Sequence, residues 1–444
     1  MTIFGSATGR RELCCLGTLG ALLTLAAIVG PSLHRAFGGM AWLGLLLVWT
    51  LLAFAAQQIS RAIPRRSALI VILGVAALMR LAMVLEPPYL SSDIYRYVWD
   101  GRVQAAGINP YRYVPDAPEL ARLRDAAIYP NINRASYAPT IYPPVAQMLF
   151  WLITRFGDSV MAMKLGLLGF EALGIAALIG IQRCAGVPPA SVVAYVWHPL
   201  PVWEIAGNGH VDAAMLGLML GGILLFVRGR NTQAGLVVAL AAFVKPTALL
   251  AMPMLWRPWN WRLPALLIVV AGAVYLPYLS AGKGVFGFLA GYVAEEELAS
   301  GGGFRYLAML QRLVGTIPGG NAIYVACAAA VLVGLALRTG FRTDRSAPSS
   351  LQALGVLILT FMLLLTPHYP WYYLTLGPLL VLTSWLTPWV LMTGGFVLYP
   401  GDSLPPFLQR ETMLHLTALA AAAFDVWRTW QRHPKSLQRD EVPS

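Results

Sequence analysis

Long apolar runs recur from one end of this chain to the other, and they constrain its fold more than any other feature. A helix needs about 20 apolar residues to cross the roughly 30 Å hydrocarbon core of a bilayer. Candidate spans lie near residues 12–30, 39–57, 67–85, 159–181, 190–206, 211–227, 262–281, 320–337, 350–367, 371–386, 388–400 and 412–428. Only 12% of the residues are charged and 58% are hydrophobic, which excludes an ordinary soluble domain. We therefore expect an all-α integral membrane protein of about twelve spans.

Two further apolar stretches, residues 141–157 and 233–256, are short or interrupted by proline. If both crossed the membrane completely, Arg228 and Arg230 would lie outside, against the bias of basic loops toward the cytoplasm. If both enter and return on the same side, those arginines lie inside. We favour the second arrangement, because irregular backbone at membrane depth is tolerated where it lines a cavity of the protein.

The basic residues of the short connections set the expected orientation, because such loops are mostly cytoplasmic. They place both ends of the chain inside and residues 87–140 outside. We expect one membrane domain over residues 1–428, without a soluble domain, and a cytoplasmic polar tail over residues 429–444. The net charge of +12 then serves orientation, and nucleic acid is not an expected partner.

Residues 87–140 are polar and rich in aromatic side chains, so we expect the chemistry of the protein there. Residues 92–106 have the pattern of an amphipathic surface helix, which Ser91 or Ser92 can cap and Gly107 can end. The apolar side of this helix is expected to face the bilayer interface and consists of Ile94, Tyr95, Val98, Trp99 and Val103.

Asp93 is the strongest candidate for a catalytic group. It begins this helix directly after a span, and Arg96, Tyr97 and Asp100 follow on the same helix face. A carboxylate at this place can take the proton from an acceptor hydroxyl. Alternatively, Asp93 only stabilises the first turn through the helix dipole. Asp100 suits an ion pair with Arg96 or Arg102 better than a catalytic role.

Ionisable residues inside apolar runs are candidates for function. Lys245 follows an interrupted helix and can reach a phosphate, or it can extend to the membrane interface. His210 and Asp212 lie in a glycine-rich break and can bind sugar or phosphate, or cap the next helix. His368 can contact the same groups, or it belongs to an aromatic belt. Glu204 is either structural or part of the cavity.

The sequence has no metal-ligand spacing, no Walker motif and no G-x-G-x-x-G loop. Its four cysteines are scattered without a C-x-x-C pair. We therefore expect no metal or other cofactor, and we do not expect a nucleotide-sugar donor.

A series of short motifs runs through most of the chain. They are Ser92-Asp93-Ile94-Tyr95-Arg96-Tyr97, Trp99-Asp100-Gly101, Gly107-Ile108-Asn109-Pro110-Tyr111, Tyr142-Pro143-Pro144, Gly207-Asn208-Gly209-His210-Val211-Asp212, Lys245-Pro246-Thr247 and Pro367-His368 through Trp371. In their order the chain resembles the polytopic GT-C glycosyltransferases. Within that group it is similar to the bacterial mannosyltransferases that include the phosphatidylinositol mannoside and lipomannan enzymes.

The resemblance implies a GT-C-type bundle with re-entrant and interfacial helices in the bacterial plasma membrane, with its active site on the periplasmic face. It implies a polyprenyl-phosphate sugar, often mannose, as donor, and a glycolipid or glycan as acceptor. It also implies a catalytic base in the first large external loop, carried here by Asp93, and a histidine in a late external loop, carried here by His368. Many relatives have an acidic pair and a metal in the first loop, whereas Ser92 and Ile94 flank Asp93 here, which argues against a metal.

We therefore predict an inverting sugar transfer at the external membrane surface, with Asp93 and His368 at the reacting groups. The residues expected to bind the phosphate, sugar or prenyl chain are Arg96, Arg102, His210, Asp212, Lys245, Tyr95, Tyr97, Tyr142, Trp371 and Tyr372. One alternative is a transporter or flippase for a lipid-linked glycan, which would use the same cavity without breaking a bond. Another is an arabinosyl (pentosyl) transferase of the same fold.

Overall fold

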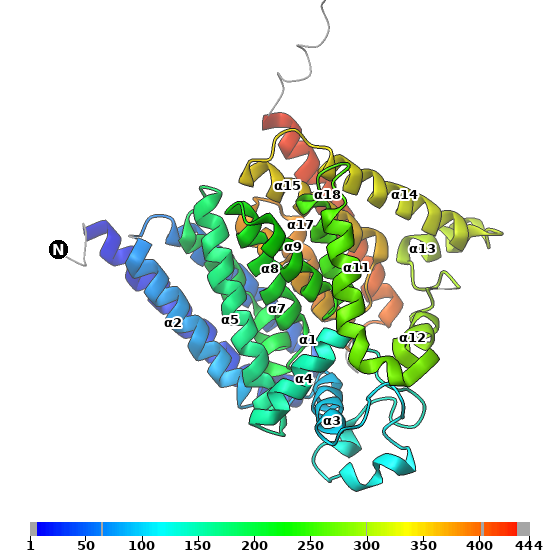
Figure 1. Cartoon of the computed structure of the whole chain (residues 1–444). Coiled ribbons are helices and arrows are strands. Elements are labelled where there is room, and N and C mark those ends of the chain that lie inside the picture. Colours follow the sequence, from blue (N-terminus) through cyan, green and yellow to red (C-terminus); the bar gives the residue numbers. More distant parts are fainter. Residues whose placement is uncertain (1–6, 64, 299, 401–403, 433–444) are drawn as a thin grey trace, which may run out of the picture.

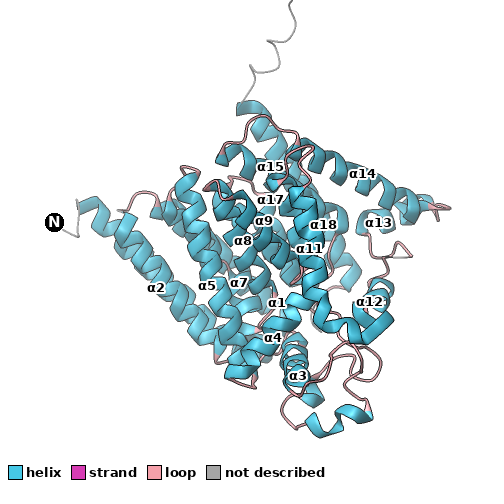
Figure 2. Ribbon diagram, in the orientation of Figure 1, coloured by secondary structure: helices cyan, strands magenta, loops and turns pink. Residues whose placement is uncertain are grey.

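The computed structural model describes residues 7–63, 65–298, 300–400 and 404–432. Within these ranges all regular elements are helices and no strand occurs (Figure 2), which confirms the all-α prediction. Most of the expected polar tail, residues 433–444, lies outside the described residues.

The helices fall into two groups by length. The longer ones are α1 (Ala7–Ser60), α2 (Arg65–Val84), α5 (Val160–Cys184), α8 (Asp212–Val227), α11 (Arg262–Tyr275), α14 (Gly320–Gly340), α15 (Ala347–Leu365) and α18 (Phe407–Arg432). The shorter ones are α3 (Asp93–Ala105), α4 (Pro144–Phe156), α6 (Val193–Val196), α7 (Pro199–Pro201), α9 (Asn231–Ala242), α10 (Met252–Leu255), α12 (Leu289–Glu295), α13 (Arg305–Val314), α16 (Gly377–Leu382) and α17 (Thr387–Gly394). The 3₁₀ and π elements are η1 (Pro118–Leu123), η2 (Tyr129–Asn131), η3 (Pro189–Val192), η4 (Val202–Gly207), η5 (Pro246–Ala251), η6 (Leu276–Phe286), η7 (Pro370–Leu376) and η8 (Gly395–Leu398).

The chain is an integral membrane protein with fewer uninterrupted spans than expected. Six helices of the described ranges are long and apolar enough to cross a bilayer, and a bent helix pair would make a seventh. The expected count of about twelve is not confirmed. Two of the expected spans, residues 371–386 and 388–400, fold instead as the short elements η7, α16, α17 and η8, of which η7, α16 and α17 have a proline at their start.

The 54-residue helix α1 is two antiparallel spans rather than one. Its backbone leaves the helical conformation at Gly38, where φ is 75°. Gly20 in the first half faces the ring of Trp197, and Trp49 in the second half donates a hydrogen bond to the carbonyl of Trp197. The two halves therefore lie side by side, as the apolar runs 12–30 and 39–57 predict.

Broken helices carry the middle of the chain into the bundle and out again. The pair Pro199–Gly207 and Asp212–Val227 bends by 118° at its break. The next segment, α9 with η5 and α10, enters and leaves at one end of the bundle, because Gly235 near its start packs against Leu263 just after its finish. Arg228 and Arg230 in the α8–α9 connection favour such a return to the same side, because basic connections are mostly cytoplasmic.

Helix α3 lies inside the protein, not on a membrane surface. Ile94, Val98 and Trp99, which were expected to face the bilayer interface, are fully buried, so that expectation was wrong. The reason is that other parts of the chain pack on α3: helix α4 and segment 106–143 lie beside it (Figure 1), and Ile94 packs against Gly209 between η4 and α8. Gly101 makes the close approach possible, since a Cβ there would lie 2.6 Å from the carbonyl oxygen of Phe150 in α4.

Candidate active site

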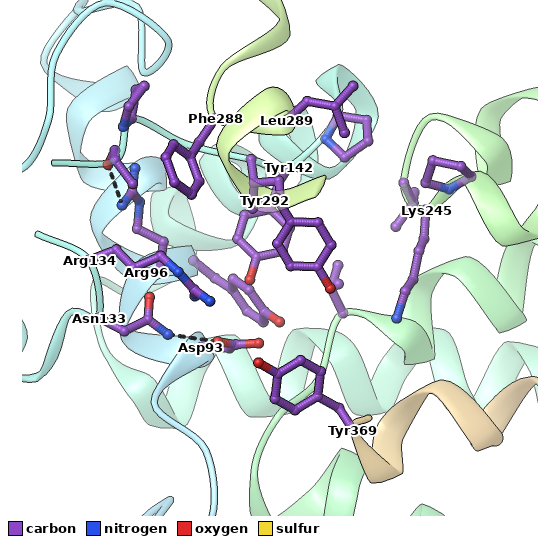
Figure 3. A pocket seen from close by; sticks show the side chains of 18 of the residues that line it. Asp93, Arg96, Asn133, Arg134, Tyr142, Lys245, Phe288, Leu289, Tyr292 and Tyr369 are labelled. Atoms are coloured by element: carbon purple, nitrogen blue, oxygen red, sulfur yellow. Dashed lines mark hydrogen bonds between the residues drawn. The ribbon is translucent and has the colours of Figure 1, made fainter. Parts of the chain in front are cut away.

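One cavity of about 830 Å³ lies where the broken helices meet α3. Its walls come from α3, segment 133–143, the start of α8, the α9–η5 turn, α12 and the start of η7 (Figure 3). The sequence-predicted residues that line it are Asp93, Arg96, Tyr97, Tyr142, Asp212, Lys245, Trp371 and Tyr372. Segments far apart in the sequence thus converge on one site, as the motifs predicted.

Asp93 points into this cavity and is about one-fifth exposed, with 19% of its side chain accessible. Its Oδ1 accepts a hydrogen bond of 2.9 Å from the side-chain amide of Asn133 (Figure 3). Its Oδ2 lies 3.9 Å from Nδ1 of His210. The amide fixes one carboxylate oxygen, and the other remains available to a reacting group in the cavity.

Gly209 explains how Asp93 comes so close to His210. Its φ of 72° lies in the left-handed region, which turns the chain between η4 and α8. A Cβ at Gly209 would lie 2.2 Å from Cδ1 of Ile94, the neighbour of Asp93. Only glycine allows α3 to pack this closely on the helix break.

Arg96 lines the cavity but is already held by protein groups. Its Nε donates to Oδ1 of Asp100 at 2.8 Å, and Nη1 donates to the carbonyl of Ala138 at 3.1 Å. Asp100 also accepts hydrogen bonds from Thr140 and Gln147. Asp100 is therefore the ion-pair partner of Arg96, as the sequence indicated.

Lys245 lies at the end of the broken α9 and reaches the cavity. Its Nζ lies 2.7 Å from Oδ1 of Asp212 and 3.8 Å from the ring centroid of Tyr372. The hydroxyl of Tyr372 is in turn hydrogen-bonded to that of Tyr292 in α12 at 2.5 Å. The ammonium group of Lys245 therefore lies in the cavity, opposite the wall that carries Asp93.

The sequence analysis did not predict Arg134, which lines the cavity together with Arg96 and Lys245. Its Nε donates to Oε2 of Glu295 at 2.7 Å, and the hydroxyl of Tyr137 donates to Oε1 of Glu295 at 3.0 Å. Burial lowers the pKa of the Arg134 guanidinium, but the hydrogen bond and the charge of Glu295 together outweigh burial. The net pKa is raised above its ordinary value, so the guanidinium stays charged. No motif surrounds Arg134; its φ of 56° and its partner on α12 could not be read from the sequence.

Two predicted residues lie on the far side of α3. At about 100° per residue, Tyr95 and Arg102 project from the side of α3 opposite Asp93. Arg102 is bound between Asp125 and Asp158 at 2.8 and 3.0 Å, and Tyr95 lines a separate depression of about 410 Å³.

His368 also stays outside the residues that line the cavity. Its Nε2 lies 3.5 Å from Glu411 of α18, and its Nδ1 lies 3.9 Å from Glu296, just after α12. The chain turns at Pro370, so that its neighbours Tyr369 and Trp371 reach the cavity while His368 packs behind them.

His210 is buried behind the cavity wall. Its ring stacks on Trp371 with the centroids 4.1 Å apart and the planes at 19°. Its Nε2 lies 3.3 Å from Oε2 of Glu204, which is fully buried. Glu204, which the sequence left open between a structural and a cavity role, is thus connected to Asp93 through His210.

The cavity has an apolar wall beside these polar groups. Tyr275, Val285, Phe286, Phe288 and Leu289 form it, from the end of α11 to the start of α12. Phe286 and Leu289 remain 60% and 50% exposed, on a part of the chain apolar enough to lie in a membrane. The site therefore offers a hydrocarbon-compatible side next to charged groups.

In the described ranges, no group of three or more His, Cys, Asp or Glu residues is arranged to hold a metal ion. The independence from metals that the sequence suggested stays a prediction.

Fold and site together define a polytopic membrane protein with a carboxylate-bearing cavity beside an apolar wall. Residues 16–262 match the family model described as alpha-(1->6)-mannopyranosyltransferase, N-terminal domain. This match covers more than half of the chain, and the chain belongs to that family.

Curated relatives carry the same description. Alpha-(1->6)-mannopyranosyltransferase A of Mycobacterium tuberculosis is 30% identical over 40% of this chain and 34% of its own length. Alpha-(1->6)-mannopyranosyltransferase B of Corynebacterium glutamicum is 24% identical over 68% of this chain and 57% of its own. A probable alpha-(1->6)-mannopyranosyltransferase of Mycolicibacterium smegmatis is 27% identical over 47% of this chain and 37% of its own. The chain spans about a third to just over half of the length of these relatives, and no solved structure matches it.

Proposed function

We propose that this protein is a mannosyltransferase that moves mannose from a polyprenyl-phosphate donor to a hydroxyl of a glycolipid or glycan. The observation that carries the proposal is the cavity itself, in which the carboxylate of Asp93 faces a polar space between cations and an apolar wall. The printed names of the relatives support mannose as the sugar. The distribution of basic residues supports a reaction on the external face of a bacterial plasma membrane.

Asp93 is the catalytic base of the proposed reaction. One of its oxygens is occupied by Asn133, and the other is free to accept the proton of the acceptor hydroxyl. The acceptor oxygen then bonds to the anomeric carbon, while the bond from that carbon to the phosphate oxygen breaks. The proton remains on Asp93, and polyprenyl phosphate leaves with the electron pair. A single displacement of this kind inverts the anomeric configuration.

The leaving phosphate needs positive charge, which Lys245 and Arg134 supply from two sides of the cavity. Both cations have a carboxylate partner in the empty cavity, Asp212 and Glu295 respectively. A dianionic or monoanionic phosphate between them would share these cations with their partners. The apolar wall around Phe286 and Leu289 suits the prenyl chain, which can enter from the bilayer.

Turnover by the purified full chain in lipid nanodiscs tests the proposal. Radiolabelled polyprenyl-phosphate mannose and a membrane lipid extract are supplied to the wild type, to Asp93→Asn and to Asp116→Asn. Asp116 is an exposed aspartate of the same segment, so its variant controls for loss of a carboxylate as such. We expect labelled product from the wild type and Asp116→Asn only.

Other outcomes are equally informative. Near-normal turnover by Asp93→Asn would exclude Asp93 as the catalytic base. Transfer from polyprenyl-phosphate arabinose but not from polyprenyl-phosphate mannose would identify arabinose as the transferred sugar. Movement of label across the bilayer without a new glycosidic bond would establish transport instead.

A further inference from the structure

The side chain of His210 lies between two carboxylates. Its Nδ1 is 3.9 Å from Oδ2 of Asp93 on the cavity side, and its Nε2 is 3.3 Å from Oε2 of Glu204 on the interior side. The ring is covered by Trp371, and only 1% of the side chain is accessible. A buried imidazole with a carboxylate at each nitrogen is held in one orientation by its surroundings.

The Nε2 of His210 has no hydrogen-bond partner within the described residues, and the carboxylate beside it is that of Glu204. Glu204 lies in the π-helical η4, and both of its oxygens accept hydrogen bonds from the hydroxyl of Tyr399, at 2.9 and 2.8 Å. The side-chain amide of Asn208 donates a further hydrogen bond of 3.0 Å to Oε2. These donors satisfy both oxygens of the buried carboxyl group and fix its orientation.

We propose that His210, which lies between Glu204 and Asp93, is a positioning residue that keeps the carboxylate of Asp93 directed at the acceptor hydroxyl. This inference rests on the proposed function, because it assigns residues that act through the proposed base. It differs from binding of sugar or phosphate by His210, since the residues that line the cavity do not include His210.

The groups around Asp93 include several phenols and one guanidinium. Ionisable groups within electrostatic reach of Asp93 include Arg134, Tyr97, Tyr142, Tyr369, Tyr372 and Tyr399. Phenols are neutral at physiological pH. Arg134 is already paired with Glu295, whereas the Nδ1 of His210 faces Oδ2 of Asp93 at 3.9 Å.

The backbone around His210 does not depend on its side chain. The amide of His210 donates to the carbonyl of Glu204 at 2.9 Å, and the carbonyl of His210 accepts from Ala213. Substitutions of the imidazole therefore leave the helix break in place. His210→Phe keeps a ring against Trp371 and removes both nitrogens, whereas His210→Gln keeps a hydrogen-bond donor without a charge.

The test measures kcat, donor KM and the pH profile of turnover for His210→Phe, His210→Gln and Glu204→Gln. A matched control is His198→Phe, because His198 is equally buried and its ring also lies beside a tryptophan, Trp389 at 5.6 Å. Asp93→Asn is measured in parallel. Each variant is compared at equal amounts of folded protein, determined by size-exclusion chromatography and thermal unfolding.

We expect His210→Phe to lower kcat about 10-fold to 100-fold, less than the loss of the base itself, with donor KM little changed. The pH profile of its turnover should also differ from that of the wild type, because the imidazole beside the base is gone. His210→Gln should retain more of kcat than His210→Phe. Glu204→Gln should change kcat and the pH profile by less, and His198→Phe should change neither.

A wild-type pH profile and kcat in both His210→Phe and Glu204→Gln, with Asp93→Asn inactive, would overturn the positioning role while leaving the base intact. A change confined to donor KM would make His210 a binding residue and would also overturn it. Activity in Asp93→Asn, or no transfer by the wild type, would instead remove the proposed function on which the inference rests.

Discussion

The ammonium of Lys245 and the carboxylate of Asp212 lie 2.7 Å apart at the point where two broken helices meet. Asp212 begins α8 and Lys245 ends the α9 segment, so one ion pair joins the two re-entrant parts of the chain. The pair faces the cavity with Tyr372 beneath the ammonium. It can thus serve both the packing of the two segments and the binding of an anion.

Removal of Lys245 should weaken donor binding. A hydrogen bond from a charged donor contributes about 1.5–3 kcal/mol, so Lys245→Met is expected to raise donor KM by about 10-fold to 100-fold. The variant also leaves Asp212 unpaired, which destabilises the fold. Lys245→Met with Asp212→Asn removes both charges and should restore the unfolding temperature but not donor KM. Lys283→Met, an exposed lysine of η6, is the control; an unchanged KM in the double variant would exclude Lys245 from donor binding.

Gly209→Ala should separate α3 from the helix break. A non-glycine residue at positive φ costs about 1–2 kcal/mol, and the added Cβ would collide with Ile94. Gly107→Ala is a matched control, because Gly107 has a similar φ of 75° but nothing within 4 Å of the added Cβ. We expect both to lower the unfolding temperature, and only Gly209→Ala to lower kcat. Equal kcat in the two variants would show that the close contact with Ile94 does not set the geometry of Asp93.

Arg134→Gln should affect binding more than stability. The pair with Glu295 is partly exposed, with 28% and 30% of the side chains accessible, and such pairs contribute about 1 kcal/mol or less. If Arg134 binds the donor phosphate, Arg134→Gln raises donor KM and Glu295→Gln does not. If the pair only ties segment 133–143 to α12, both variants change KM alike. Steady-state kinetics at two salt concentrations separate the two cases, with the exposed Arg112→Gln as control.

Glu296 should make stability depend on pH. Burial raises the pKa of its carboxyl, and the nearby His368 opposes that shift only in part. A carboxyl with a raised pKa in the folded state binds a proton that the unfolded chain has released, so its stabilising contribution is lost as pH rises through the folded pKa. The unfolding temperature of Glu296→Gln should therefore rise relative to that of the wild type as the pH increases toward neutrality. The increase should begin at about pH 4.5, the ordinary pKa of a glutamate carboxyl. Thermal unfolding measured across this pH range tests the prediction. Glu297 is exposed, so the control variant Glu297→Gln should show the same pH dependence as the wild type.

The sequence predicted much of this site because its motifs are local. Asp93, Arg96 and Tyr97 share one face of α3, and helical periodicity alone brings them to the same wall. Lys245, Asp212 and Trp371 were found because polar or interrupted positions in apolar runs are conspicuous. The same periodicity places Tyr95 and Arg102 on the opposite face of α3, so it argues against their role in the cavity.

Other features depend on contacts that no local pattern encodes. The burial of α3 follows from the path of segment 106–143, whose irregular turns carry no periodic signal. Asn133 and Arg134 belong to that segment and reach the site through it. The expected number of spans is not confirmed by the helix lengths, because an apolar run indicates burial in a protein interior as readily as in lipid. Thr387 and Asp425, joined by a hydrogen bond of 2.7 Å, are part of such an interior.

The helix break at Asn208 to Val211 also bears on biogenesis. Asp93 and His210 are translated within the first half of the chain, but Trp371 and Tyr399 complete their surroundings. A nascent chain that ends after residue 262 would contain the base and its imidazole without the rings and the phenol that cover them. Insertion of the last third of the protein is therefore the step at which the surroundings of this polar break are completed.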